Sequence, residues 1–152
     1  MDPNNSSPVI LIAEDDEDDF FLIREALAEA KLEEDLYWVK DGEELIDFLL
    51  RRSTSKNFSE APRPAMIILD LNLPKKDGRV ALQEIKTNPE LRKIPVIALT
   101  NSKDREDLNK TYDLGVNAFI TKPLSFLGFI KIADQIKKFW FETSKLPDTS
   151  SR

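Results

Sequence analysis

The sequence predicts an α/β fold, a three-layer (βα)5 doubly wound sandwich with one five-stranded parallel sheet. Two observations lead to this fold class. Short apolar runs alternate along the chain with segments in which apolar residues recur every three or four positions. Three of the runs, VILIA, MIIL and VIAL, are apolar throughout, which is typical of parallel strands covered by helices on both faces.

The apolar runs give the expected strands and the periodic segments give the expected helices. The strands are predicted at 9–13, 36–39, 66–69, 96–99 and 118–120. The helical repeats are Phe20, Ile23, Leu27 and Ala30; Leu45, Ile46, Leu49 and Leu50; Val80, Leu82 and Ile85; Leu108 and Tyr112; and Phe126, Phe129, Ala133, Ile136 and Trp140. In a sheet of this kind the functional crevice lies at the carboxyl ends of the strands, which tells us where to look for a site.

A chain of 152 residues has the usual length of one domain. We expect a flexible N-terminus over 1–8, the folded domain over 9–144 and a C-terminal tail over 145–152. Within the domain, 52–64 is a charged loop rich in Ser and Pro, longer than most connections from a helix to a strand. A tolerated surface insertion is favoured over a binding loop here.

Composition excludes several classes of function. The chain has no Cys and no His, which removes thiol nucleophiles, histidine-containing zinc sites and Ser-His-Asp triads. A net charge of −6 argues against direct binding of nucleic acid, which needs clustered basic residues. We find no apolar run of about 20 residues and no secretory leader at the start, so we expect a cytoplasmic protein without membrane contact.

Six consecutive acids, Glu14 to Asp19, follow the first predicted strand. Asp18 or Asp19 is explained by the start of the next helix, where carboxylates bind free N–H groups. Glu14 and Asp15 lie at the strand end itself and should point into the crevice. Carboxylates crowd there at a cost unless a cation offsets them, and oxygen ligands of this kind suit Mg²⁺.

Three later strands also end in residues that can do chemistry. Asp70 follows the apolar run MIIL, Thr100 ends the fourth strand, and Lys122 follows the fifth. A metal, an ammonium and a hydroxyl around one carboxylate would support phosphoryl transfer onto Asp70. Mg²⁺ would neutralise charge, while Lys122 and Thr100 would hold phosphoryl oxygens. Such a reaction depends on positioning and charge, so the lack of His does not hinder it.

With these residues in place, the chain resembles the receiver domains of bacterial response regulators, the CheY-like proteins of two-component phosphorelay signalling. The resemblance covers residues 8 to 141. It implies a flavodoxin/CheY-like fold and a phosphoprotein whose aspartyl phosphate forms on Asp70, with a sensor histidine kinase as donor. It also implies that Asp15, Asp70 and the backbone carbonyl of Asn72 coordinate Mg²⁺, with Glu14 acting through water.

The same resemblance implies three features of the switch. The Lys122–Pro123 peptide would be cis. Phe119 would turn inward as Thr100 moves onto the phosphoryl group. Gly78 would occupy a turn before the third helix, where glycine suits a positive φ. One departure is that the acid pair is Glu-Asp rather than the commoner Asp-Asp.

Within the family, three features resemble the single-domain regulators of cyanobacterial and bacterial phytochromes. They are the 52–64 loop, the phrase LPKKDGR and the aromatic tail KFWF. This implies a phytochrome-type histidine kinase as donor, and commonly a homodimer. The tail supports self-association independently, because Ile132, Phe139 and Phe141 remain outside the core-facing stripe of the last helix. Packing within the chain's own C-terminal segment is the alternative.

Other classes of function fit less well. A haloacid-dehalogenase phosphatase would need an acid two residues after its nucleophile, where this chain has Asn72. A flavodoxin-like FMN carrier would not place six acids where phosphate binds. We therefore expect no enzyme beyond Mg-dependent self-phosphorylation and slow autodephosphorylation, with the signal passed on through protein contacts. A phosphorylation-independent receiver-like binding module is the remaining alternative.

Overall fold

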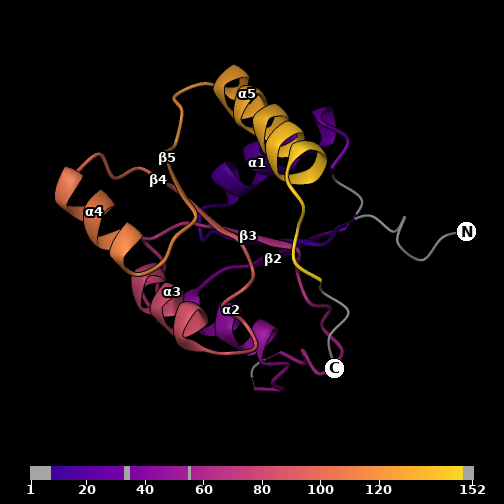
Figure 1. Ribbon diagram of the computed structural model, residues 1–152, viewed down its shortest axis with the longest axis vertical. Helices are drawn as coiled ribbons and strands as arrows, with labels where there is room; N and C mark the ends of the chain where they lie inside the picture. Colours follow the sequence, from indigo (N-terminus) through magenta and orange to yellow (C-terminus); the bar gives the residue numbers. More distant parts are fainter. Residues whose placement is uncertain (1–7, 33–34, 55, 149–152) are drawn as a thin grey trace, which may run out of the picture.

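The computed structural model describes residues 8–32, 35–54 and 56–148 and contains one parallel sheet in the order β2-β1-β3-β4-β5 (Figure 1). This confirms the predicted fold class. The strands begin and end within one residue of the predicted positions. They are β1 (Ile10–Ala13), β2 (Leu36–Val39), β3 (Met66–Leu69), β4 (Val96–Thr100) and β5 (Ala118–Thr121).

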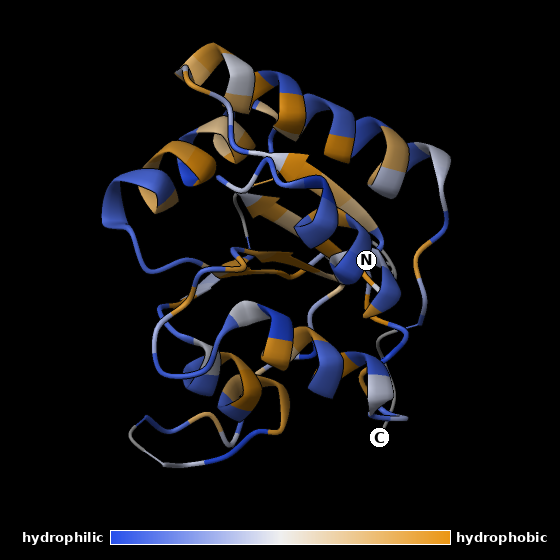
Figure 2. Ribbon diagram, turned by 90° about the vertical axis from the view of Figure 1, so that its left-hand side faces the viewer, coloured by the Kyte–Doolittle hydropathy of each residue, from blue (hydrophilic) through white to orange (hydrophobic). Residues whose placement is uncertain are grey.

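Helices cover both faces of the sheet, as the continuous apolar strands predict (Figures 1 and 2). On one face lie α1 (Glu17–Glu29) and α5 (Phe126–Ile136), and α5 continues as the π-helix η2 (Lys137–Thr143). On the other face lie α2 (Gly42–Leu49), α3 (Gly78–Thr87) and α4 (Arg105–Asp113). In Figure 2 the apolar colour is concentrated in the strands and on the helix faces turned toward them.

Two hydrophobic cores follow from this layering. Side chains alternate across each strand, so Ile12 and Ile68 pack under α1 and α5, while Leu11 and Ile67 pack under α2 and α3. These strand residues are almost completely buried, and each contributes about 1.5–3 kcal/mol by leaving water. The buried centre of the sheet fixes the positions of the strand ends relative to one another.

Each of the five α-helices is directly preceded by a residue whose side chain accepts a backbone N–H from the first turn, which stabilises the helix start. These caps are Asp16, Asp41, Asp77, Asp104 and Ser125. Four of the chain's acids therefore have a structural role as helix caps.

The predicted apolar stripes are buried or half-buried in α1 and α2, whereas α3, α4 and α5 each expose one predicted residue, namely Val80, Tyr112 and Phe126. Tyr112 is largely exposed, and the buried residue of α4 is Thr111, whose hydroxyl donates to the carbonyl of Asp107 at 2.7 Å. Val80 of α3 is also half-exposed, and Ala81 packs in the core instead. The predictions for these residues are wrong because each of the three helices buries a narrower face than its apolar residues suggest.

The loop after α2 is anchored by a few contacts. Ser53 and Asn57 form an isolated bridge, and Phe58 packs edge-on against Phe48 of α2. Of the predicted terminal segments, residues 1–7 and 149–152 lie outside the described residues, and the domain limits of 9 and 144 stay predictions. Every helix among the described residues is too short or too polar to cross a lipid bilayer.

Candidate phosphoryl-transfer site

The carboxyl ends of the strands bring the predicted site residues together. The chain runs from β1 to β2 on one side and pairs β1 with β3 on the other, so the topological switch point lies between β1 and β3. Glu14 and Asp15 follow β1 and Asp70 follows β3, which places acids on both sides of this switch point. The ends of β4 and β5 add Thr100 and Lys122.

Lys122 is the centre of the site. Its ammonium lies 2.8 Å from Glu14 Oε1, 2.7 Å from Asp19 Oδ2 and 3.0 Å from Asp70 Oδ2. The lysine side chain is only 4% exposed. Its backbone N–H donates to the carbonyl of Thr100 at 2.7 Å, which ties the residue to the end of β4. A buried cation is thus held directly beside the predicted acceptor carboxylate.

Three carboxylates form a candidate site for a divalent cation. One oxygen each from Glu14, Asp15 and Asp70 lies within 4.8 Å of the others. Glu14 and Asp70 are buried while Asp15 is exposed, so the group opens to solvent on one side. Hard oxygen donors at this spacing fit Mg²⁺ or a similar ion.

The charges of the site are strongly coupled. Burial raises the pKa of Glu14 to about 8, repulsion from Asp70 adds to this, and the hydrogen bond from Lys122 partly offsets it. Burial disfavours the charged form of Lys122, but hydrogen bonds to Asp19 and Glu14 and attraction by Asp70 outweigh it, so the lysine pKa lies above its ordinary value. Without a metal, Glu14 therefore resists ionisation.

Thr100 and Phe119 lie on the neighbouring strands β4 and β5. Thr100 is fully buried, and its hydroxyl accepts the N–H of Ser102 at 3.4 Å. Phe119 is half-buried against the core on the α4 side, and its N–H donates to the hydroxyl of Tyr112 at 3.2 Å. These contacts link both predicted switch residues to α4 and the loop before it.

A second charged contact connects the acceptor loop with α4. Arg79 binds Asp107 through two nitrogens, Nε and Nη2, each 2.6 Å from a carboxylate oxygen. Its Nη1 also donates to the carbonyl of Leu71, the residue after Asp70, at 3.3 Å. The hydrogen bonds raise the pKa of Arg79, and they lower the pKa of Asp107. Nothing in the sequence pattern indicated this pair, because its members lie 28 residues apart.

Two predictions about the surrounding backbone are wrong. None of the described peptide bonds is cis, so the Lys122–Pro123 peptide is trans, the isomer that is intrinsically favoured by about 0.5–1 kcal/mol. Gly78 does not have a positive φ and is the first residue of α3. Glycine is needed there because a Cβ would lie 2.5 Å from the carbonyl oxygen of Asp70. Close approach of α3 to the acceptor loop, rather than a turn, requires this glycine.

The roles of the acidic run also differ from the expectation. Asp16, not Asp18 or Asp19, caps α1, by accepting the N–H of Asp19 at 3.0 Å. The side chain of Asp19 binds Lys122 instead. The sequence held no signal for this choice, because Asp18 and Asp19 both lie in the first turn of α1.

Trp38 of β2 contacts Glu14, the first residue of the Glu14–Asp15 pair. Its indole N–H donates to the carbonyl oxygen of Glu14 at 2.7 Å, and its ring stacks on Phe20 of α1 with centroids 3.9 Å apart. The sequence could not predict this contact, because it depends on how α1 lies across the edge of the sheet. Trp38 thereby satisfies a carbonyl beyond the end of β1.

Comparison with known proteins agrees with this geometry. The family model described as the response regulator receiver domain matches residues 10–134. The response regulator Rcp1 of Synechocystis sp. is 41% identical over 146 residues, covering 96% of this chain and 97% of the relative.

Two solved structures are similar over nearly their whole length. The phosphorylated cyanobacterial phytochrome response regulator RcpA has 40% identity and a TM-score of 0.87, covering 94% of this chain and 100% of the other. The Mn²⁺-bound form of Rcp1 has 40% identity and a TM-score of 0.84, covering 93% and 99%.

The chain belongs to the response regulator receiver domain family, and it is a response regulator of two-component signalling similar to those of phytochromes. Receiver domains bind a divalent metal, and the group of Glu14, Asp15 and Asp70 is the donor set that fits one here.

Proposed function

We propose that Asp70 accepts a phosphoryl group from a phosphohistidine. The observation that carries this proposal is the buried Lys122 ammonium, 3.0 Å from Asp70 Oδ2, beside two further acids. A carboxylate oxygen of Asp70 would form the new P–O bond as the P–N bond of the donor breaks. The leaving imidazole nitrogen keeps the electron pair and takes a proton from water. Lys122 and the Thr100 hydroxyl would hold phosphoryl oxygens.

Mg²⁺ is the proposed cation. Asp15, Asp70 and the carbonyl of Asn72 would hold it directly, and Glu14 would act through water. When bound, the ion supplies charge neutralisation for the acceptor carboxylate and the phosphoryl oxygens. The Asn72 N–H donates to Asp70 Oδ1 at 3.1 Å, which orients the acceptor carboxylate before any ion arrives.

The proposed donor is a sensor histidine kinase of the phytochrome type, because RcpA is a regulator of a cyanobacterial phytochrome. The reaction is a single self-phosphorylation followed by slow autodephosphorylation, not turnover of an external substrate. We place it in the cytoplasm, where such kinases form phosphohistidine from ATP.

The signal would leave through the surface formed by α4, β5 and α5. Thr100 moving onto the phosphoryl group would vacate space for Phe119, whose backbone is tied to Tyr112 of α4. Phe119→Ala should accept the phosphoryl group normally but lose the conformational response. Identical phosphorylation-dependent changes in the NMR spectra of wild type and variant would contradict this role.

A homodimer is proposed through the C-terminal helix. Ile132 and Phe141 pack on the core, whereas Phe139 is 54% exposed. Phe139 and Trp140 line an apolar groove of about 400 Å³ against β5. A second copy could cover this groove. Gel filtration at high concentration, with and without phosphodonor, tests it, and a monomer mass in both states would refute it.

The decisive experiment is intact mass spectrometry after treatment with acetyl phosphate, with and without Mg²⁺. Wild type should gain one Mg²⁺-dependent phosphoryl adduct, and Asp70→Asn should gain none. Asp47→Asn, which alters a carboxylate of α2 away from the site, is the matched control and should still be phosphorylated. No adduct on wild type would favour a phosphorylation-independent binding module instead.

A further inference from the structure

The ammonium of Lys122 is surrounded by three carboxylates: it donates hydrogen bonds to Asp19 and Asp70 and forms an ion pair with Glu14. Lysine offers three N–H donors and accepts nothing. Three carboxylates, those of Glu14, Asp19 and Asp70, lie within 3.0 Å of its nitrogen. A phosphoryl oxygen arriving at Asp70 can therefore bind Lys122 only if one of these contacts gives way.

A divalent cation would relieve two of the three contacts but not the third. Glu14 and Asp70 belong to the carboxylate group that can hold a metal, so an ion there draws their charge away from the lysine. Asp19 lies outside that group. It projects from the first turn of α1 with its side chain 27% exposed, and it binds Lys122 at 2.7 Å. Once the metal is bound, Asp19 is the strongest remaining partner of the lysine.

We propose that Asp19 is a positioning residue that competes with the phosphoryl group for Lys122. The inference rests on the proposed function of Asp70 and adds a residue to it. Asp19 holds the ammonium beside the acceptor before phosphorylation and must release it, wholly or in part, as the phosphoryl oxygens arrive. Asp19 thus sets how favourable the phosphorylated state is.

The competition predicts two effects of opposite sign for Asp19→Asn. Without the Asp19 charge, Lys122 stays more firmly on Glu14 and Asp70 in the metal-free protein, so Mg²⁺ should bind more weakly. At saturating Mg²⁺ the freed lysine should bind the phosphoryl analogue beryllofluoride more tightly. An amide oxygen accepts a weaker hydrogen bond than a carboxylate, which predicts changes of about fivefold in each direction.

The test is isothermal titration calorimetry on the full chain, first with Mg²⁺ alone and then with beryllofluoride at saturating Mg²⁺. Asp18→Asn is the matched control, because it removes the same charge from the same helical turn. It should change both affinities by less than twofold, whereas Asp19→Glu should restore the wild-type pattern. A loss of folding would weaken both ligands together, so the opposite signs distinguish competition from damage.

Three results would overturn the inference. They are equal effects of Asp18→Asn and Asp19→Asn, unchanged affinities in Asp19→Asn, or weaker beryllofluoride binding in Asp19→Asn. If wild type itself binds no beryllofluoride with Mg²⁺, the proposed function of Asp70 fails instead.

Discussion

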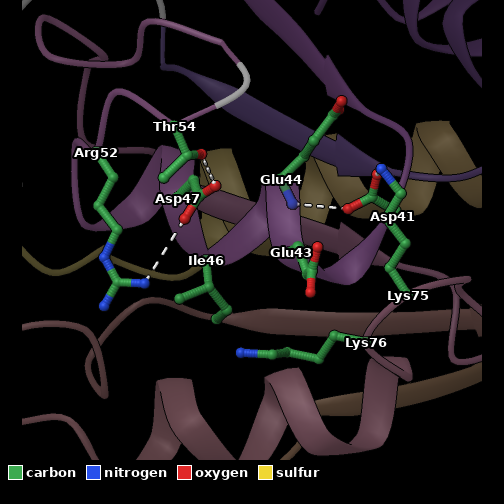
Figure 3. A pocket seen from close by; sticks show the side chains of 9 residues that line it. All are labelled: Asp41, Glu43, Glu44, Ile46, Asp47, Arg52, Thr54, Lys75 and Lys76. Carbon is green, nitrogen blue, oxygen red and sulfur yellow. Dashed lines mark hydrogen bonds and ion pairs between the residues drawn. The ribbon is translucent and has the colours of Figure 1, made fainter.

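Two groups of charged residues lie near the carboxyl ends of the strands, and they differ in kind. The rim cluster consists of Glu14, Asp19, Asp70 and Lys122. The α2 pocket is a cavity of about 370 Å³ beside α2, lined also by lysines of the segment that follows β3 (Figure 3). Its lining residues are Asp41, Glu43, Glu44, Ile46, Asp47, Arg52, Thr54, Lys75 and Lys76. Both groups are rich in acids, but only the rim cluster has the features of a reactive site.

The difference lies in the exposure of the cations and in charge balance, since Asp41 is as buried as Asp70. In the α2 pocket, acids face separate bases across open space: Lys75 lies 3.7 Å from Asp41 with its side chain 62% exposed, and Arg52 lies 3.6 Å from Asp47. Asp41 also caps α2. In the rim cluster, one buried ammonium serves three carboxylates. Exposed cations that each pair with one acid act as surface ion pairs, whereas several buried acids around one cation form the arrangement that a further cation can stabilise.

The largest effect on stability is predicted for a substitution of Lys122. Lys122→Met leaves Glu14 and Asp70 buried without their cation, which should lower the free energy of unfolding by about 2–3 kcal/mol in metal-free buffer. The loss stays below that of other broken buried pairs because Glu14 can take up a proton. Urea denaturation with EDTA measures it, and saturating Mg²⁺ should restore most of the stability. A loss below about 1 kcal/mol would contradict the proposed difference between the rim cluster and the α2 pocket.

An intermediate effect is predicted for the partly buried pair of Arg79 and Asp107. Asp107→Asn should cost about 1–2 kcal/mol at pH 7, because the two hydrogen bonds from the guanidinium lose their charged acceptor. The Asp107 pKa is lowered in the folded protein, so this stability is present above the unfolded pKa of about 4 and is lost as the pH falls further.

Urea denaturation at several pH values tests this linkage. The difference between wild type and Asp107→Asn should be constant between about pH 5 and 7 and should shrink below about pH 4. Glu106→Gln, on the same turn of α4 with an exposed side chain, is the control. A difference that stayed the same at acidic pH would mean that the effect comes from packing rather than from the ion pair.

The smallest effect is predicted in the α2 pocket. Lys75→Met removes an exposed lysine that lies 3.7 Å from Asp41 and should change stability by less than about 0.5 kcal/mol, an effect that salt screens further. Asp41→Ala, by contrast, also removes the cap of α2 and should cost about 1 kcal/mol whatever the salt concentration. Thermal unfolding at low and high salt separates the two. A larger, salt-sensitive loss for Lys75→Met would assign the α2 pocket an electrostatic role like that of the rim cluster.

The strands and the rim of the site could be predicted because their signals are local. An apolar run such as MIIL must be covered on both faces, and parallel strands bring the residues after them to one edge of the sheet. Asp70, Thr100 and Lys122 were located in this way. Neither step requires knowing how the helices pack.

The features that sequence patterns missed depend on distances between elements. Asp18 and Asp19 are equivalent in the sequence, and the crossing of α1 near Lys122 decides that Asp19 makes the ion pair. Gly78 is required by the approach of α3 to Asp70.

The sequence by itself determined the sheet, its layers and the residues at the strand ends, because hydrophobic burial and strand direction act over short stretches of chain. The tertiary structure decided which acids share Lys122 and which contacts reach α4, because a hydrogen bond requires its partners to lie within about 3 Å.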